Sequence, residues 1–269
     1  LLLATIFSFG ITMYWSSEYQ IHSFTPLEKP PDVLRERSKT IIKALGYEDS
    51  QADSADGFGT DGGYLNSSLK SEYEAPNEQL RKGQPLLKYF WYRQSPEMMV
   101  PIAFHKIGES NPHFDTYGSI RLRLDALGRL VQMIAIPESK RPNTAKAEIN
   151  WKTLFQEAGL DIQKFKESRP MLVSPYFSDE SMAWEGTLAD FGDIPIRVEA
   201  AEFHGRPVYF KVVMPWDKAL VDDSQITQAR KQASNIGNIV GVSVAVLFIL
   251  GAVFISYHNV KVGRVDLNG

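Results

Sequence analysis

The most restrictive feature of the sequence is a long uncharged run near its C-terminal end. No Lys, Arg, Asp or Glu occurs from Gln232 to Val260, and the centre of this run, residues 239–257, is almost entirely apolar. A helix of about 20 apolar residues, rising about 1.5 Å per residue, spans the hydrocarbon core of a bilayer. A helix that is apolar on all sides has little use in a water-soluble domain. The run therefore predicts a transmembrane helix at residues 237–258.

The N-terminal end of the sequence is apolar as well. Residues 1–15 carry no charge, and Tyr14 and Trp15 are of the kind that gathers at membrane–water interfaces. The stretch begins without Met, has no basic region and is followed by no A-x-A cleavage site, which disfavours a cleaved signal peptide. We predict a transmembrane helix at residues 1–16, truncated at its start, and expect the chain to be a fragment of a longer protein.

The residues between the two predicted spans, 17–236, are numerous enough to fold around a core of their own. The chain is 43% hydrophobic and 12% aromatic, which is typical of a folded domain. Its formal net charge of -3 provides no basic platform for nucleic acid. The sequence contains no cysteine, which excludes disulfides, cysteine-ligated zinc and thiol catalysis.

The first part of this middle region, residues 17–146, predicts a helix, a loop and three strands. Pro30-Pro31-Asp32 begins the helix and Gly46 stops it. A polar, glycine-rich stretch predicts the loop, and aromatic or alternating stretches predict a strand and a hairpin. In the hairpin, Arg121 and Arg123 alternate with apolar residues and are expected to face water. In order, these elements are expected at residues 30–45, 48–83, 88–93, 120–124 and 130–136.

The second part, residues 147–220, repeats the order of helix, strand and hairpin. Asn150 is expected to cap the helix and Gly159 to end it. His204-Gly205 is expected to form the turn of the hairpin. The strands are expected at residues 182–188, 194–202 and 207–214.

The repeated order of elements sets the predicted fold class. We predict an α+β domain of two units, in which two curved antiparallel sheets each pack against a helix. The spacing in the two units differs because the first carries the long loop, so the repeat is one of architecture. The transmembrane spans are expected at residues 1–16 and 237–258, and the two units of the domain at residues 17–146 and 147–220. A juxtamembrane linker is expected at residues 221–236 and a juxtamembrane tail at residues 259–269.

Two short motifs match nucleotide chemistry without its structural context. Gly57 to Gly62 spells G-x-G-x-x-G, but it follows an acidic loop and no predicted strand, and negative charge there would repel phosphate. Asp190 to Gly192 spells the D-F-G triplet of protein kinases, but the chain has no H-R-D loop, strand Lys or A-P-E motif around it. We interpret both stretches as turns.

No set of potential ligands or catalytic residues has the spacing that its chemistry requires. Four aspartates between residues 49 and 61 could suggest calcium, but their spacing does not fit a D-x-D-x-D-G loop. Two histidines with a nearby aspartate are the best candidates for zinc, although histidines without helical spacing are usually solvated. We predict no catalytic, metal-binding or cofactor-binding residue in this chain. The residues weighed are Asp49, Asp53, Asp56, Asp61, His105, His113, Asp115 and His204.

Two groups of residues are candidates for binding. Four residues in predicted strands could face a ligand groove, although aromatic residues in strands are usually part of the core. Gly237 and Gly241 have the G-x-x-x-G spacing that seats a partner helix in a membrane, which suggests a homodimer through the transmembrane helices. The four strand residues are Trp91, Arg93, Trp184 and Glu185.

Several short blocks of the sequence carry a resemblance to a known family. They are Phe24–Leu34, Leu45–Tyr47, Ala52–Phe58, Phe90–Pro96, Leu124–Leu130, Ala158–Asp161, Ala183–Gly186 and Val198–Phe210. In this order they resemble the region that follows the catalytic domain in a family of bacterial eukaryotic-like serine/threonine protein kinases. The resemblance covers nearly the whole chain from about residue 20.

The resemblance implies a location and a missing partner domain. A cytosolic kinase domain, using ATP and Mg²⁺, would precede the first span, and residues 17–236 would lie outside the cytoplasmic membrane of a bacterium. In the family the second span is followed by an Arg-rich segment and further hydrophobic helices; residues 260–269 are less basic than that. No catalytic residue carries over, because none of the kinase motifs lies in this chain.

These observations lead to three hypotheses of function. The first is the membrane-anchored extracytoplasmic sensor or interaction region of a receptor-like serine/threonine kinase, which binds an unknown ligand or protein and biases the kinase through paired transmembrane helices. The alternative is a membrane-tethered scaffold or assembly module of an envelope complex without kinase activity. The third is an envelope hydrolase, for which His105, His113 and Asp115 are the best candidate residues.

Overall fold

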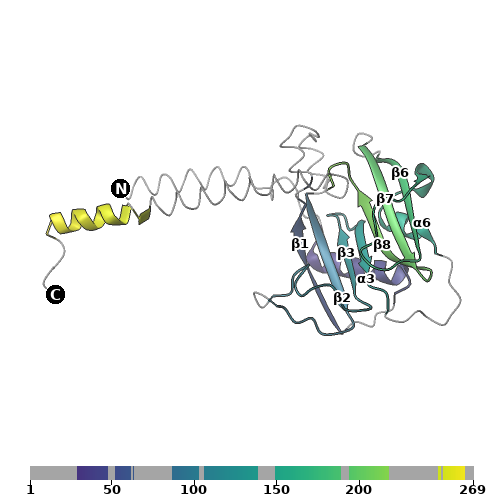
Figure 1. Cartoon of the computed structure of the whole chain (residues 1–269), viewed down its shortest axis with the longest axis horizontal. Coiled ribbons are helices and arrows are strands. Elements are labelled where there is room, and N and C mark those ends of the chain that lie inside the picture. The colour runs from purple at the N-terminus through teal and green to yellow at the C-terminus, as the bar shows by residue number, and fades with distance from the viewer. Residues whose placement is uncertain are drawn as a thin grey trace. The chain divides into compact units, whose positions relative to one another are not determined.

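The computed structural model describes residues 29–47, 52–61, 63, 87–102, 106–138, 149–188, 194–217, 248–249 and 251–263 (Figure 1). The chain divides into two compact units, residues 1–217 and 218–269. The first unit contains a β-sheet and the helices that pack on it. In the second unit, residues 251–261 form a helix.

The first unit is built on an antiparallel sheet of eight strands. The elements in chain order are α3 (Pro31–Ala44), β1 (Asp53–Thr60), β2 (Lys88–Ser95), β3 (Ile120–Leu124), β4 (Leu130–Ala135), α6 (Trp151–Glu157), the 3₁₀ helix η1 (Ile162–Lys164), β5 (Lys166–Ser168), β6 (Glu180–Leu188), β7 (Ile194–Phe203) and β8 (Arg206–Val213). The order across the sheet is β1-β2-β3-β4-β8-β7-β6-β5, so two four-stranded meanders meet where β4 pairs with β8. The predicted α+β fold is confirmed.

The prediction of two separate sheets is wrong. Gln132, Met133 and Ile134 of β4 form an antiparallel ladder with β8, and this ladder joins the two meanders into one sheet. Without it, both strands would present unpaired backbone groups at an edge, which is unfavourable. Each half still follows the predicted order, with α3 before β1 to β4 and α6 before β5 to β8. The predicted boundary between the units, at residue 146, lies outside the described residues.

Both α-helices of this unit begin and end with the local signals expected from the sequence. Pro31 is the first residue of α3, and the side chain of Asn150 accepts a hydrogen bond from the backbone of Lys152 at the start of α6. Gly46 and Gly159 follow the two helices with φ angles of 82° and 70°. Backbone bonds from each glycine and from the residue after it return to the last helical turn, which is the Schellman arrangement.

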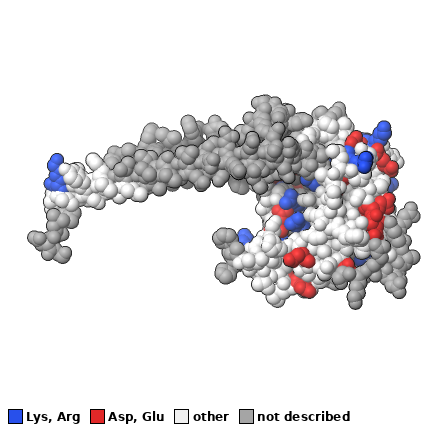
Figure 2. Space-filling view, viewed as in Figure 1, with Lys and Arg blue, Asp and Glu red and all other residues white. Residues whose placement is uncertain are grey.

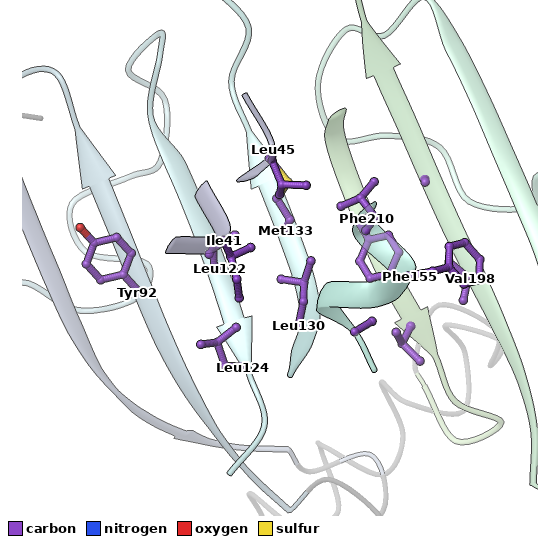
Figure 3. Packing of buried hydrophobic residues seen from close by; sticks show 14 of the residues in the cluster. Ile41, Leu45, Tyr92, Leu122, Leu124, Leu130, Met133, Phe155, Val198 and Phe210 are labelled. Carbon is purple, nitrogen blue, oxygen red and sulfur yellow. The ribbon is translucent and has the colours of Figure 1, made fainter. Parts of the chain in front are cut away.

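The two α-helices cover the same face of the sheet and share one hydrophobic core with it. Figure 3 shows Ile41 of α3 beside Leu122 of β3, and Phe155 of α6 beside Phe210 of β8. The rings of Phe155 and Phe210 lie 6.4 Å apart between centroids. Burying a side chain of this size stabilises the fold by about 1.5–3 kcal/mol.

The strand β1 occupies part of the predicted loop at 48–83, so that prediction is wrong over residues 53–60. In the pairing of β1 with β2, Gly57 lies opposite Trp91 and Gly59 lies opposite Tyr89. A Cβ on Gly59 would lie 2.3 Å from the Tyr89 ring, and a Cβ on Gly57 would lie 2.8 Å from the Trp91 ring. The start of the G-x-G-x-x-G stretch is therefore extended strand, and its glycines make room for rings from the neighbouring strand.

The opposite face of the sheet is covered in part by the loops at 96–119 and 169–179. Arg121 and Arg123 point to this face, and both side chains are only partly exposed. Arg123 pairs with Glu109 of the first loop at 2.5 Å. The prediction that these arginines face open water is therefore wrong, because the loop folds back over them and supplies a carboxylate.

Within the described ranges, no helix is both long and apolar enough to cross a membrane. The predicted span at 1–16 lies outside the described residues, as do part of the predicted span at 237–258 and both Gly237 and Gly241. Both spans stay predictions.

Candidate functional site

The four residues considered for a ligand groove lie in two strands that are not neighbours in the sheet. Trp91 and Arg93 belong to β2, whereas Trp184 and Glu185 belong to β6. Trp184 is buried in the core under α6, and Trp91 is buried on the opposite face of the sheet. Glu185 is exposed and forms an ion pair with Arg197. The structure does not bring the four residues together, and both tryptophans are part of the packed interior.

Arg93 ties the sheet to the loop at 96–119. Its guanidinium is almost fully buried and donates only to backbone oxygens of this loop. Burial, together with the nearby positive charge of Arg121, lowers the pKa of Arg93. Because its two terminal nitrogens donate to the backbone of the loop, Arg93 positions the loop, while its Nε is buried without a hydrogen-bond partner among the described residues. The accepting oxygens belong to Gly108, Glu109, Pro112 and His113.

The residues weighed for metal or catalytic chemistry are dispersed. His113 and Asp115 are exposed in the loop, and His105 lies outside the described residues. Asp56 of β1 pairs with Arg35 of α3 at 2.6 Å. Among the residues that the structure describes, no group of three His, Cys, Asp or Glu side chains is placed to hold a metal ion.

Two further stretches singled out in the sequence are His204-Gly205 and Asp190 to Gly192. His204-Gly205 forms the predicted two-residue turn between β7 and β8, and its positive φ angles of 54° and 81° are those of a type I′ turn. The backbone of His204 also donates to Asp179 at 2.9 Å. Asp190 to Gly192 lies outside the described residues.

The sheet has two ends with different chemistry. We call proximal the end at which β1 finishes at Thr60 and β8 finishes at Val213, and distal the end at which β7 finishes at Phe203 and β8 begins at Arg206. A small pocket of about 60 Å³ lies at the proximal end. It opens between the β3–β4 hairpin and the end of β8, where the two halves of the sheet meet.

Charges of both signs line the proximal pocket. Lys211 pairs with Asp217 at 3.3 Å, and Arg129 pairs with Asp125 at 2.6 Å. Burial raises the pKa of Asp61, and the negative charge of Asp217 adds to this effect. The space suffices for a few water molecules. Two ion pairs thus line this junction between the two halves, while one terminal nitrogen of Arg129 is buried without a hydrogen-bond partner in the described part of the chain.

A larger cleft opens at the distal end. Its volume of about 380 Å³ is within the range of small-molecule pockets. Two of its rings, Tyr117 and Phe177, are 61% and 66% exposed, and clustered exposure of large apolar side chains marks interaction sites. The lining residues are Tyr117, Ile136, Pro137, Glu138, Tyr176, Phe177 and Phe203. We call this the aromatic cleft.

Turns and ring contacts hold the side chains of the aromatic cleft in place. Gly118 has a φ of 79°, reverses the chain after Tyr117 and donates to the backbone oxygen of Ile136 at 3.0 Å. Phe177 packs edge to face on Phe203, with ring centroids 5.6 Å apart. The exposed rings are therefore anchored to the ends of β4 and β7.

Sequence reasoning missed the aromatic cleft because its residues belong to no motif. They come from positions between 117 and 203 and meet only after the sheet has formed. One signal was present: Tyr117 and the pair Tyr176-Phe177 are aromatic residues in stretches where no strand is predicted. Tyr176 is partly buried against a small core cluster, whereas Tyr117 and Phe177 are exposed, as is typical of an interaction surface.

The described surface carries charges of both signs. On the face shown in Figure 2, acidic and basic side chains lie next to one another in several places, with uncharged surface between these groups. An extended field of one sign is what steers polyelectrolytes such as nucleic acids. This face of the described residues has no such field.

Comparison with known proteins adds no relative from which a function could be transferred. No protein-family model, no curated protein and no solved structure matches this chain. The functional argument therefore rests on the residues and on their geometry.

Proposed function

We propose that this chain is the membrane-anchored, extracytoplasmic sensor or interaction region of a receptor-like serine/threonine protein kinase and is itself non-catalytic. In this proposal, the two-part α+β domain lies between transmembrane helices at 1–16 and 237–258. The aromatic cleft is its binding site. The kinase part of the proposal is supported by the resemblance of the sequence blocks alone.

The observation that carries the proposal is that the chain enters and leaves the folded domain at one end of the sheet. Lys29, near the start of the described chain, has its amino group 3.6 Å from the place that a Cβ on Gly128 would take, in the proximal β3–β4 turn. Asp217, the last described residue of the domain, is held at the proximal end by Lys211. Both ends of the described domain therefore lie at the proximal end of the sheet, opposite to the aromatic cleft.

The described part of the second unit supports a lipid-facing segment. Phe248, Phe254 and Tyr257 are each more than 60% exposed, and so are Ile249 and Val253. Val253 and Phe254 are successive residues of a helix and therefore point in different directions. Apolar side chains exposed in several directions favour a lipid environment over water.

A receptor of this kind transmits a signal only if its ligand discriminates between two states. A ligand that binds both states equally shifts no equilibrium, however tightly it binds. The Lys211–Asp217 ion pair is a contact that could differ between states. It fixes the last described residue of the domain to β8, and the chain then continues toward the second predicted span.

Single-cysteine labelling tests the topology. The sequence of residues 1–269 contains no cysteine, so an introduced thiol is the only one in this chain. Val173→Cys, at a site that is 91% exposed in the domain, is expected to react with a membrane-impermeant maleimide in intact spheroplasts. Lys261→Cys, beyond the second predicted span, is expected to react only after permeabilisation. Recovery of the chain outside the membrane fraction, or equal labelling of both variants in intact spheroplasts, would overturn the proposed topology.

The kinase assignment has a separate test. The coding sequence upstream of residue 1 is expected to contain the Gly-rich loop, the strand Lys, the H-R-D loop and the D-F-G triplet of a protein kinase. If these motifs are missing, the kinase assignment is wrong. Co-purification with a stable multi-subunit complex, without phosphotransfer, would instead support the scaffold hypothesis.

A further inference from the structure

We propose that the aromatic cleft binds a soluble small molecule that carries an alkylated ammonium group. The inference rests on the proposed function in taking the cleft as the outward-facing binding site. It goes further by naming the chemical class of the ligand. The argument uses the ring composition of the cleft, its charge and its place in the fold.

Aromatic rings dominate the lining of the cleft. Tyr117, Tyr176, Phe177 and Phe203 contribute rings from three separate chain segments, and two of these rings are more than half exposed. The face of an aromatic ring carries negative charge density and attracts a cation within about 6 Å of its centre. Several rings around one space are the usual means of holding an ammonium group that has methyl groups in place of hydrogen-bond donors.

The charge of the cleft has the matching sign. Glu138 is the only charged side chain among the described residues that line it, and this side chain is exposed. A carboxylate beside aromatic faces favours a cation and disfavours an anionic ligand. The guanidinium groups of Arg93 and Arg121 lie over the ring of Phe114 at 5.5 and 5.0 Å and do not line the cleft. Their charge does act on the hydroxyl of Tyr176, where it opposes the rise in pKa that burial causes.

The polar groups of the cleft fit a sugar less well. Discrimination among sugars needs several hydrogen-bonding groups at fixed positions. Apart from Glu138, the described side chains of the lining offer only the hydroxyls of Tyr117 and Tyr176, and the Tyr176 hydroxyl donates to the backbone oxygen of Phe114. An alkylated ammonium group needs none of these donors.

The position of the cleft favours a soluble ligand over a lipid headgroup. The cleft lies at the distal end, at the ends of β4 and β7, whereas Lys29 and Asp217 lie at the proximal end. The cleft is thus at the end of the sheet opposite to both ends of the described domain, and we assign it to a ligand that arrives from the aqueous side.

The test compares choline with its uncharged isostere 3,3-dimethyl-1-butanol. The full chain is used in polyoxyethylene-ether micelles, because phosphatidylcholine would compete with choline and a maltoside headgroup would compete with a sugar. Binding is followed by titration calorimetry or by NMR line broadening of the ligand. Choline is expected to bind with a Kd in the millimolar range, and the isostere about tenfold more weakly or not at all. Equal binding of the two would show an apolar cleft without preference for a cation and would overturn the proposal.

Variants locate the binding and control for folding. Tyr117→Leu and Phe177→Leu change exposed rings and are each expected to weaken choline binding about fivefold to tenfold, and Glu138→Gln about threefold. Phe58→Leu makes the same kind of change at a ring of β1 outside the cleft and is expected to leave binding unchanged. All variants should remain folded with a cooperative unfolding transition. Phe177→Leu and Phe58→Leu each lose one edge-to-face ring contact, with Phe203 and with Phe90, so small and similar losses of stability are expected for these two.

Two outcomes separate this inference from the proposed function. If the labelling confirms the topology but the folded wild type does not bind choline, the ligand class is wrong and the topology stands. If choline binds in micelles but Val173→Cys is protected in spheroplasts, the cleft binds a cation and the extracytoplasmic placement is wrong. Binding of a glucose oligomer in place of choline would also overturn the inference.

Discussion

At the scale of single residues, the rings of β2 decide which side chains β1 can carry. Tyr89 and Trp91 point to the same face of the sheet and lie flat over their partners on β1, which are both glycines. Arg123 in turn lies over the ring of Tyr89 at 4.4 Å. The rings of β2 therefore pack over β1, although β1 itself has no side chain at Gly57 and Gly59.

This packing makes Gly59→Ala a sharp test of the edge strand. The new methyl group would overlap the ring of Tyr89, so we expect a loss of about 1–3 kcal/mol in the free energy of unfolding. The matched control is Gly108→Ala, where the nearest heavy atom to a new Cβ is 3.9 Å away. Urea unfolding of both variants gives the comparison, and equal stabilities would contradict the observed pairing of β1 with β2.

A second residue-scale prediction concerns alkaline pH. Burial, with the negative charges of Glu199 and Asp217, raises the pKa of Tyr209 from 10.0 to about 12. Between these values the unfolded chain has lost the proton that the folded protein keeps. The contribution of Tyr209 to stability is therefore fully present below pH 10 and falls by about 1.4 kcal/mol per pH unit as pH rises toward 12.

Tyr209→Phe removes this titration and keeps the ring. Plots of unfolding free energy against pH should run parallel for wild type and variant below pH 9, and the variant should fall less steeply above pH 10. Chemical denaturation at a series of pH values provides the measurement. Identical slopes above pH 10 would show that the Tyr209 hydroxyl is not buried in solution.

At the scale of elements, signals carried by neighbouring residues were sufficient for much of the architecture. Gly46 and Gly159 end their helices, and His204-Gly205 turns its hairpin, because the required backbone angles are set within a few residues. The strand β1 and the covering of Arg121 could not be found in this way. They depend on pairing with segments tens of residues away, and glycine in a strand looks like a turn until its partner strand is known.

The same distinction holds for the candidate site. The alternation along β3 correctly indicated that Arg121 shares a face with Arg123, but nothing local specified the loop that covers that face. The aromatic cleft is still less accessible to sequence reasoning, since Tyr117, Phe177 and Phe203 meet only through the order of the strands. A strand order that places β8 between β4 and β7 is a property of the whole sheet.

The loop at 96–119 provides a prediction at the scale of an element. Arg93→Met would leave its carbonyl acceptors without their buried donor, and we expect a loss of about 2–4 kcal/mol in stability. Release of the loop should also speed tryptic cleavage at exposed Lys106. Lys164→Met, an exposed change on η1, is the control; equal cleavage rates for the two variants would show that Arg93 does not hold the loop.

At the scale of the whole molecule, contacts between the halves extend well beyond the short β4–β8 ladder. Arg37 of α3 pairs with Glu157 of α6 at 2.5 Å. The hydroxyl of Tyr47, just after α3, donates to the backbone oxygen of Pro207 in β8 at 2.6 Å. The main hydrophobic core contains residues of both helices and of strands from both halves. The repeated order of elements therefore describes the architecture alone, and one common core and its cross-contacts stabilise both halves together.

The shared core predicts that the two halves unfold together. Leu122→Ala in the first half and Phe155→Ala in the second each remove a fully buried side chain and should cost about 2–5 kcal/mol. If the core is common, either variant lowers the opening free energy of the amides of β2 and β7 by the same amount, because those amides exchange through a single global transition. Native-state hydrogen exchange measures both strands in one sample. A loss of protection confined to the altered half would mean that the β4–β8 ladder joins two domains that fold independently. The aromatic cleft draws residues from both halves, and it would then lack the rigid frame that selective binding requires.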